Sequence, residues 1–168
     1  MKRIIIHWTA GTYQPNTHEF ECYHYLVTGD GLVIEGKYKP EDNLYCYDGI
    51  YAQHTGGGNT GSIGIAMCGM FVPKNTPLQM TKYPLTKIQC ERCFKLIAEL
   101  AKKYELLINP QTVMTHYEFG LKHPNTSSAG KIDITWLPAY EYLKANEIGD
   151  FIRNKSRWYL ARQQDPKN

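Results

Sequence analysis

The sequence predicts an α/β fold, a single domain in which a central mixed β-sheet is flanked by α-helices. Short apolar runs that are typical of buried strands occur near the start of the chain and again at residues 113–115. A helical repeat of apolar residues begins after Thr86. The length of 168 residues suits one domain. Hydrophobic residues make up 42% of the chain, which is enough for a core. Because helices lie between and after the strands, we expect them to flank a mixed sheet.

Four strands are expected in the first half of the chain. Residues 4–7 form an apolar, β-branched run that ends at a histidine. Residues 24–27 and 32–34 are joined by an Asp-Gly turn, which is typical of a hairpin. Residues 62–70 alternate small and apolar side chains and are expected to form a central strand. Residues 36–61 show no period, so we predict a long loop, a kind of segment that is often functional.

The clearest helix begins after Thr86, which forms a predicted capping box with Gln89. Cys90 and Cys93 fall on its apolar face, so we interpret them as small core residues. No second Cys/His pair has a matching spacing, which argues against a zinc or redox role for this Cys-x-x-Cys motif. The five cysteines are an odd number and no secretion signal is visible, which favours reduced thiols.

The second half of the chain is expected to hold one strand, a loop and two helices. The strand at residues 113–115 ends at His116, and a polar loop follows at 120–131. One helix is predicted from Leu137-Pro138 to about residue 146, because proline is tolerated in a first helical turn. A short basic amphipathic helix is predicted at 151–161, with a frayed end after it.

Charge divides the chain unevenly. The formal net charge is +3, but residues 151–168 hold five Lys/Arg and one Asp, and the rest is close to neutral. We therefore predict a domain at 1–149 and a basic C-terminal tail or short helix at 150–168. A nucleic-acid partner is not expected for the near-neutral domain. No apolar run is long enough for a membrane span, and the first residues resemble a strand more than a signal peptide.

Two histidines occupy predicted strand ends, where side chains are held rigidly but remain open to a cleft. They are His7 and His116, and Asp133 follows the polar loop. Two imidazoles and a carboxylate are a catalytic zinc set that leaves a fourth position for water. Spacing alone leaves the alternative of ordinary, partly buried histidines open, because no short metal motif such as His-Glu-x-x-His is present.

Five segments resemble the zinc-dependent N-acetylmuramoyl-L-alanine amidases, a family that includes phage lysozyme-type amidases and animal peptidoglycan recognition proteins. The first ends in Ile-His-Trp-Thr-Ala-Gly, and the last is Lys-Ile-Asp. Their order along the chain is that of the family, and together they span roughly residues 1–147. The segments are residues 4–11, 23–31, 54–65, 115–118 and 131–133.

The resemblance implies one zinc ion, bound by His7, His116 and Asp133. Asp133 stands where the lysozyme-type enzymes have cysteine, so a harder ligand replaces a thiolate. The resemblance also puts Tyr23 and Lys131 beside the metal-bound water. An ammonium group can stabilise an oxyanion, and a phenol can hydrogen-bond the water. The proton donor to the leaving amine is left open among three residues: Lys131, Tyr23 and Glu118.

The resemblance further implies a peptidoglycan or muropeptide substrate. Its expected contacts are His54, Thr55, Gly56 and Asn59 in the loop that resembles the family's substrate loop. Apart from the resemblance, Tyr45, Tyr47 and Tyr51 in the long loop are candidates to stack on sugar rings, and Tyr51 is taken as the expected contact. The expected reaction is hydrolysis of the amide bond between N-acetylmuramic acid and L-alanine. Two alternatives remain open: a module that binds muropeptides without cleaving them, and a cytosolic amidase that recycles muropeptides.

The expected setting is a phage or prophage endolysin, a monomer that is cytoplasmic as synthesised and acts on the cell wall after release. The basic tail interleaves cations with aromatic and aliphatic residues, which is typical of a contact with an anionic surface. The alternative is a C-terminal helix docked on the domain with a solvated basic face. The cations concerned are Arg153, Lys155, Arg157 and Arg162.

Overall fold

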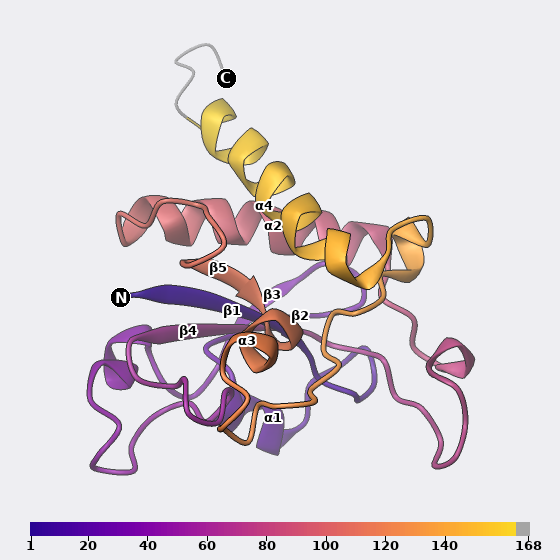
Figure 1. Ribbon diagram of the computed structural model, residues 1–168, viewed down its shortest axis with the longest axis horizontal. Coiled ribbons are helices and arrows are strands. Elements are labelled where there is room, and N and C mark those ends of the chain that lie inside the picture. The colour runs from indigo at the N-terminus through magenta and orange to yellow at the C-terminus, as the bar shows by residue number, and fades with distance from the viewer. Residues whose placement is uncertain (164–168) are drawn as a thin grey trace.

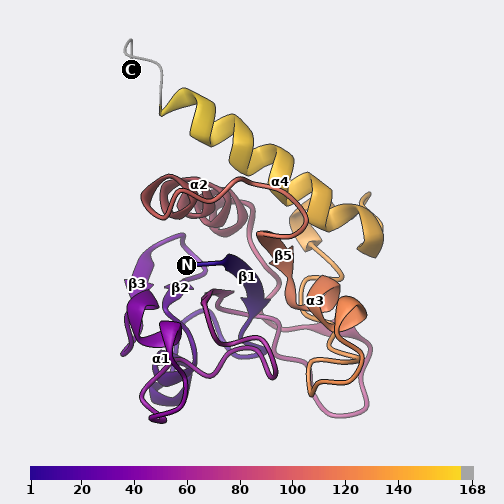
Figure 2. The same ribbon diagram turned by 60° about the vertical axis from the view of Figure 1, so that its left-hand side comes forward.

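One mixed sheet forms the centre of the computed structural model, which describes residues 1–163 (Figures 1 and 2). Its strand order is β3-β2-β4-β1-β5, and only the pairing of β2 with β3 is antiparallel. The fold class predicted from the sequence is therefore confirmed. The strands are β1 (Arg3–Trp8), β2 (Tyr25–Val27), β3 (Val33–Glu35), β4 (Ser62–Met67) and β5 (Val113–Thr115).

Both faces of the sheet are covered, which explains why its central strands are apolar throughout rather than alternating. All six residues of β4 are buried, as are five of the six in β1. Helix α2 (Lys87–Lys103) lies on one face, and α1 (Thr17–Cys22) lies with the long loop on the other (Figure 2). Helix α3 (His116–Lys122) follows β5 directly.

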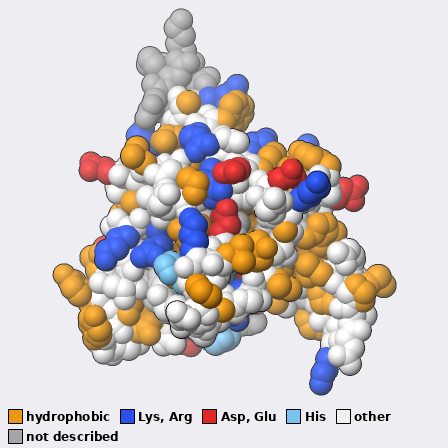
Figure 3. All heavy atoms as spheres, viewed as in Figure 1, with side chains coloured by type: hydrophobic (Ala, Val, Ile, Leu, Met, Phe, Trp, Pro, Cys, Tyr) orange, Lys and Arg blue, Asp and Glu red, His pale blue; other side chains and the backbone are white. Residues whose placement is uncertain are grey.

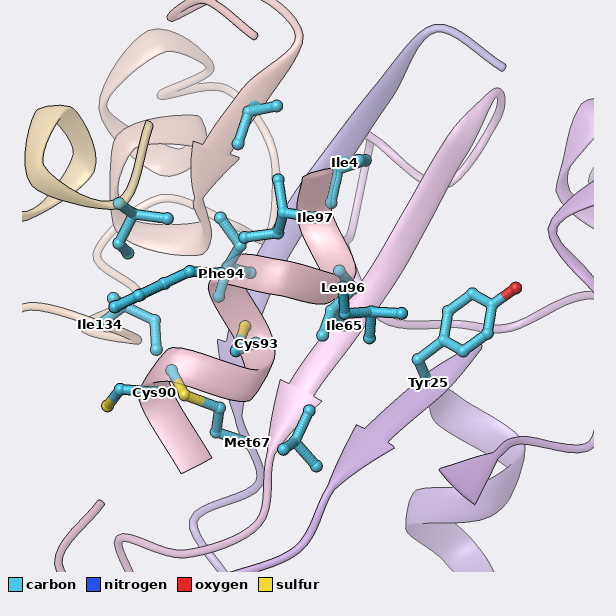
Figure 4. Packing of buried hydrophobic residues seen from close by; sticks show 14 of the residues in the cluster. Ile4, Tyr25, Ile65, Met67, Cys90, Cys93, Phe94, Leu96, Ile97 and Ile134 are labelled. Atoms are coloured by element: carbon cyan, nitrogen blue, oxygen red, sulfur yellow. The ribbon is translucent and has the colours of Figure 1, made fainter. Parts of the chain in front are cut away.

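Helix α2 begins as predicted, with a reciprocal capping box between Thr86 and Gln89. Its buried face includes Cys90, Cys93 and Phe94, which pack against β4 and its neighbours (Figure 4). Burial raises the pKa of both thiols, so their reactive thiolate form is suppressed. The interpretation of these cysteines as core residues is confirmed.

Two helical predictions were wrong in their bounds. The helix expected from Leu137 is only a 3₁₀ turn at Pro138–Tyr140. The C-terminal helix α4 instead begins earlier than predicted and spans Ala145–Arg162. The Glu147 side chain accepts the backbone N–H of Lys144 at the start of α4, and this start was overlooked because lysine is an unusual N-cap residue. Helices α1 and α3 were also not predicted, since six and seven residues are too few for a visible apolar period.

Helix α4 packs on α2, and the predicted boundary at 149/150 falls inside it. Ile148 and Ile152, one turn apart, are fully buried in the main core. This arrangement matches the alternative of a docked C-terminal helix. The predicted frayed end lies almost wholly at 164–168, outside the described residues. Among the helices of residues 1–163, none is both long and apolar enough to cross a membrane.

The cations of α4 are largely engaged within the protein. Arg153 is 3% exposed, and Lys155 forms an ion pair with Glu91 of α2, at 2.8 Å. Arg162 stacks on the Trp158 ring, 3.7 Å from its centroid. On the face drawn in Figure 3, Lys and Arg side chains lie beside Asp and Glu side chains near α4. The helix is therefore held by its charges as well as by its apolar face.

We predict that Phe94→Ala lowers the free energy of unfolding by about 3–5 kcal/mol, because a large ring is removed from a close-packed core. Phe94 is fully buried between α2, the sheet and Phe151. Urea unfolding measures the loss. The matched control is Ile88→Ala on the same helix, where the side chain is 61% exposed and a change within about 0.5 kcal/mol is expected. Equal losses in the two variants would contradict this packing.

Candidate metal centre

The pairing of β1 with β5 brings the two predicted histidine ligands together. Ile6 lies opposite Thr115 in this parallel pair, and His7 and His116 are the next residues of each strand. Their ring centroids are 4.5 Å apart. Both side chains are buried, so the two imidazoles enter the site from a rigid sheet rather than from loops. His116 is also the first residue of α3, which corrects the expectation that only a loop follows this strand.

Asp133 completes the group. Its Oδ2 atom lies 3.2 Å from Nδ1 of His7 and 3.2 Å from Nδ1 of His116. One donor atom from each of the three residues lies within 4.8 Å of the other two. The next residue, Ile134, is fully buried and has a φ of 65°, so core packing holds a sharp backbone turn beside the carboxylate.

The electrostatics of the group favour the protonation states that bind a metal ion. Burial lowers the pKa of His7 to about 4, although its hydrogen bond to Asp133 opposes this shift. For Asp133, burial raises the pKa, but the hydrogen bonds and charges of His116 and His7 outweigh it and hold the pKa well below the usual range. A neutral imidazole and an ionised carboxylate are therefore present at neutral pH, as metal ligation requires.

The ring nitrogens that face away from Asp133 also have partners. Nε2 of His116 donates to the Ser128 hydroxyl at 3.0 Å, and this hydroxyl donates to the Gly56 carbonyl at 2.8 Å. Nε2 of His7 lies 3.3 Å from the Thr55 hydroxyl and 3.3 Å from Nδ1 of His54. Such outer partners fix the tautomer and orientation of histidine ligands. They leave both Nδ1 atoms directed at Asp133, so the donor set fits a zinc ion.

The loop predicted to contact substrate lies behind these histidines. His54 is 6% exposed and Thr55 is fully buried, and their polar atoms bond each other and His7. Asn59 accepts the backbone N–H of Thr55, which closes the loop on itself. The His54 ring packs over β4 at Gly64, where an added Cβ would come within 2.5 Å of it. These residues brace the ligands rather than line an open surface.

One buried asparagine, which we did not identify from the sequence, holds the long loop in place. The Asn43 side chain is fully buried and exchanges hydrogen bonds with the backbone of Ala52 in both directions, each of 2.9 Å. It also donates to the Asn59 carbonyl and accepts from His24 Nε2. Nothing in the local sequence distinguishes this asparagine from other loop residues. Ser128 was overlooked for the same reason.

Tyr23 and Lys131 lie near the cluster of His7, His116 and Asp133. The Tyr23 ring centroid is 5.2 Å from that of His7. Burial raises the pKa of Tyr23, and the charge of Asp133 adds to this, so the phenol keeps its proton. Lys131 is exposed, yet its charge is close enough to contribute to the lowered pKa of His7. Tyr23 therefore offers a protonated phenol beside the His7 ring, and Lys131 offers an exposed ammonium group.

Glu118 is engaged elsewhere. Its Oε1 and Oε2 atoms accept from the two terminal nitrogens of Arg153 at 2.9 and 3.0 Å. Oε2 also accepts the backbone N–H of Thr115, as part of the capping box that starts α3. Both oxygens are thus committed to the helix start, which argues against Glu118 as a proton donor to substrate. Lys131 and Tyr23 remain the candidates.

A cleft opens beside Asp133. It has a volume of about 440 Å³. Lys131 and Asp133 contribute polar groups to its lining, and most of the other lining residues are apolar. Its apolar walls include Trp8, Phe71, Val72, Leu78 and Ile132. Tyr51 lies instead in a separate hollow of about 200 Å³, together with His18 and Cys22. Asp133 and Lys131 therefore line one cleft, and Tyr51 lies apart from it.

The family model for N-acetylmuramoyl-L-alanine amidases matches residues 1–133. The chain belongs to this family. The matched region contains β1 to β5 and ends at Asp133, so all three candidate ligands of this amidase-family chain fall within it. Helix α4 lies beyond the match. No curated protein sequence matches the chain.

Solved structures of low sequence identity share the fold. AmpDH3 of Pseudomonas aeruginosa has a TM-score of 0.56 at 16% identity, over 100% of this chain and 69% of its own. Another structure of AmpDH3 is a complex with anhydromuramic pentapeptide. The hydrolase AmiA of Staphylococcus aureus has a TM-score of 0.56 at 15% identity, over 96% and 74%. PGRP-SA of Apis mellifera has a TM-score of 0.51 at 18% identity, over 92% and 82%. At these identities, the likeness concerns the fold alone.

We predict that His24 makes the metal-free amidase domain lose stability in mild acid. Burial lowers its pKa from 6.5 to about 4, against the hydrogen bond to Asn43. Below pH 6.5, His24 therefore becomes protonated in the unfolded chain but stays neutral in the folded protein. The free energy of unfolding falls as the pH is lowered, until the pH reaches about 4.

Between pH 7 and pH 5 the free energy of unfolding should fall by about 2 kcal/mol less in His24→Gln than in the wild type. Urea unfolding of the metal-free protein at both pH values measures it. The control is His123→Gln, which changes an exposed histidine at the end of α3 and should leave the pH dependence unaltered. An unchanged pH dependence in His24→Gln would rule out this histidine as the cause.

Proposed function

We propose that this chain is a zinc-dependent peptidoglycan amidase that hydrolyses the amide bond between N-acetylmuramic acid and L-alanine. The observation that carries the proposal is the group of His7, His116 and Asp133 beside an open cleft, in a chain of the N-acetylmuramoyl-L-alanine amidase family. The donor set of two imidazoles and one carboxylate is that of catalytic zinc sites, which keep a position for water. We propose one zinc ion per chain.

Zinc bound at this site would polarise the scissile carbonyl and lower the pKa of a water molecule toward neutrality. The side chains of the protein supply the rest of the chemistry. Lys131, exposed beside the cluster, offers a positive charge where the carbonyl oxygen becomes negative. Tyr23 keeps its proton because of burial, so its hydroxyl can donate a hydrogen bond to the attacked group.

Proton transfer to the leaving amine falls to Lys131 or Tyr23, because Glu118 is committed to Arg153. Burial raises the pKa of Tyr23, which makes its hydroxyl a weak proton donor. Lys131 also lies in the open cleft, where a departing amine can reach it. We therefore assign it the proton donation, with Tyr23 as a hydrogen-bond donor to the tetrahedral centre.

The cleft accounts for substrate orientation. Its apolar walls, with Trp8 and Phe71 among them, suit the methyl groups and sugar face of a muropeptide, and Lys131 suits its carboxylates. The complex of AmpDH3 with anhydromuramic pentapeptide supports a muropeptide as the substrate class. Because Tyr51 lies in the separate hollow, we propose that it contacts a part of the peptidoglycan that is more distant from the scissile bond.

We predict that the zinc-loaded protein releases stem peptides from purified peptidoglycan. His116→Ala removes one donor of three and should abolish release, as should a chelator. Mass spectrometry of the soluble fraction identifies the peptides by their new L-alanine N-terminus. His123→Ala, at an exposed histidine six residues or more from any ligand, is the control and should keep full activity. A zinc-loaded wild-type protein that binds muropeptide without cleaving any wall type would establish the alternative, a binding module.

We predict that Lys131→Met lowers kcat by about 10²–10³-fold, because a preorganised charge beside the developing oxyanion is lost. The zinc content should stay the same, since Lys131 is not among the three donors. Lys74→Met, at an exposed lysine of the loop before α2, serves as the matched control and should leave kcat unchanged. A kcat within twofold of wild type in Lys131→Met would exclude both roles proposed for this lysine.

For the biological setting, we propose a phage or prophage endolysin that is cytoplasmic as synthesised, with muropeptide recycling as the alternative. Cleavage of intact sacculi favours the endolysin, whereas activity confined to soluble anhydro-muropeptides favours recycling. A contact of α4 with an anionic surface also remains a proposal. Arg157 and Arg162 are the exposed cations of that helix, so the surface contact would depend on them rather than on Arg153.

A further inference from the structure

Helix α4 carries a buried arginine that reaches the start of α3. Arg153 is 3% exposed, and both of its terminal nitrogens bind the Glu118 carboxylate, at 2.9 and 3.0 Å. One of them also donates to the Val113 carbonyl of β5 at 2.9 Å. A buried guanidinium is costly unless its hydrogen bonds are satisfied, and Asp150 supplies a further acceptor at 2.8 Å.

The contacts of Arg153 enclose the backbone that presents His116. Val113 lies three residues before this histidine, and Glu118 lies two residues after it. Glu118 in turn accepts the backbone N–H of Thr115 at 2.9 Å, while the Thr115 hydroxyl accepts the N–H of Glu118. The guanidinium therefore clamps the end of β5 to the first turn of α3, and the His116 backbone lies inside the clamp.

A glycine in α4 makes room for the contact with Glu118. Gly149 lies one turn before Arg153, and a Cβ added there would meet Glu118 Oε1 at 2.0 Å. Only a glycine lets the helix approach the carboxylate so closely. The region matched by the amidase family model ends at Asp133, so this clamp comes from a helix outside the match.

We propose that Arg153 is a positioning residue for the metal centre: through Glu118 and Val113 it fixes the direction in which His116 presents Nδ1 to the metal. This inference rests on the proposed binding of zinc by His116. Under this proposal, α4 has two roles: it packs on the core, and through Arg153 it orients a ligand of the metal centre.

The test is the zinc dissociation constant of Arg153→Met, measured by competition with a chelating dye at a temperature where circular dichroism shows folded protein. We expect about tenfold weaker binding than wild type, the lower end of the effect of removing outer partners of metal ligands. Arg153→Lys keeps the charge but cannot bind Glu118 through two nitrogens, so an intermediate affinity is expected.

The matched control is Lys155→Met. Lys155 also anchors α4 by an ion pair, but to Glu91 of α2, at 2.8 Å, and among the described residues no hydrogen bond or ion pair joins it to α3. Loosening α4 in this way should lower thermal stability and leave the zinc dissociation constant within twofold of wild type. If Lys155→Met weakens zinc binding as much as Arg153→Met, the role of Arg153 is general docking and the proposal fails.

Two further outcomes are decided by the same titration. Wild-type affinity in Arg153→Met overturns the proposal while leaving the proposed amidase function intact, whereas no zinc binding by the wild type overturns the proposed function itself. If Arg153→Met does not fold, Glu118→Gln removes the charge but keeps a capping oxygen. The same tenfold loss is then expected, and an unchanged affinity overturns the clamp.

Discussion

The parallel pairing of β1 with β5 is the interaction on which the rest of the structure depends. It sets Ile6 opposite Thr115, so that His7 and His116 leave the sheet side by side. A slip of one residue in this pair would turn one imidazole to the opposite face of the sheet. The side chains of residues 4–8 in β1 are buried, and their close packing holds each of them in place. The geometry of the site is thus secured by the same burial that stabilises the core.

The site is arranged in layers behind this pair of strands. The imidazoles share Asp133 at their inner nitrogens, and Ser128 and Thr55 occupy their outer nitrogens. Because each outer partner is itself bonded to the backbone or to a neighbouring ring, rotation of either imidazole would leave buried polar atoms unpaired. The long loop serves this layer, since Asn43 holds it from within. This long loop, in which Asn43 belongs to a 3₁₀ turn at Pro40–Leu44, is therefore held to the site by side-chain hydrogen bonds.

Periodic and compositional signals predicted the sheet and α2, because burial on one or two faces leaves a repeating pattern in the sequence. They failed for α1, α3 and the true start of α4, because α1 and α3 are short and a lysine occupies the N-cap position of α4. The ligands were assigned by resemblance to a family, since His7 and His116 are far apart in the chain. The braces of the site could not be predicted in either way. Ser128 and Arg153 are ordinary polar residues in the sequence, and only the fold shows what they contact.

The most direct measurement is the zinc X-ray absorption spectrum of the loaded protein, because it reports the ligand atoms themselves. We expect two imidazole nitrogens and light oxygen donors at about 2.0–2.2 Å, with no sulfur. Cys90 and Cys93 lie on the buried face of α2, in the core, so they are not expected to bind the ion. A sulfur ligand at about 2.3 Å, or a spectrum without imidazole scattering, would contradict a metal centre built from His7, His116 and Asp133.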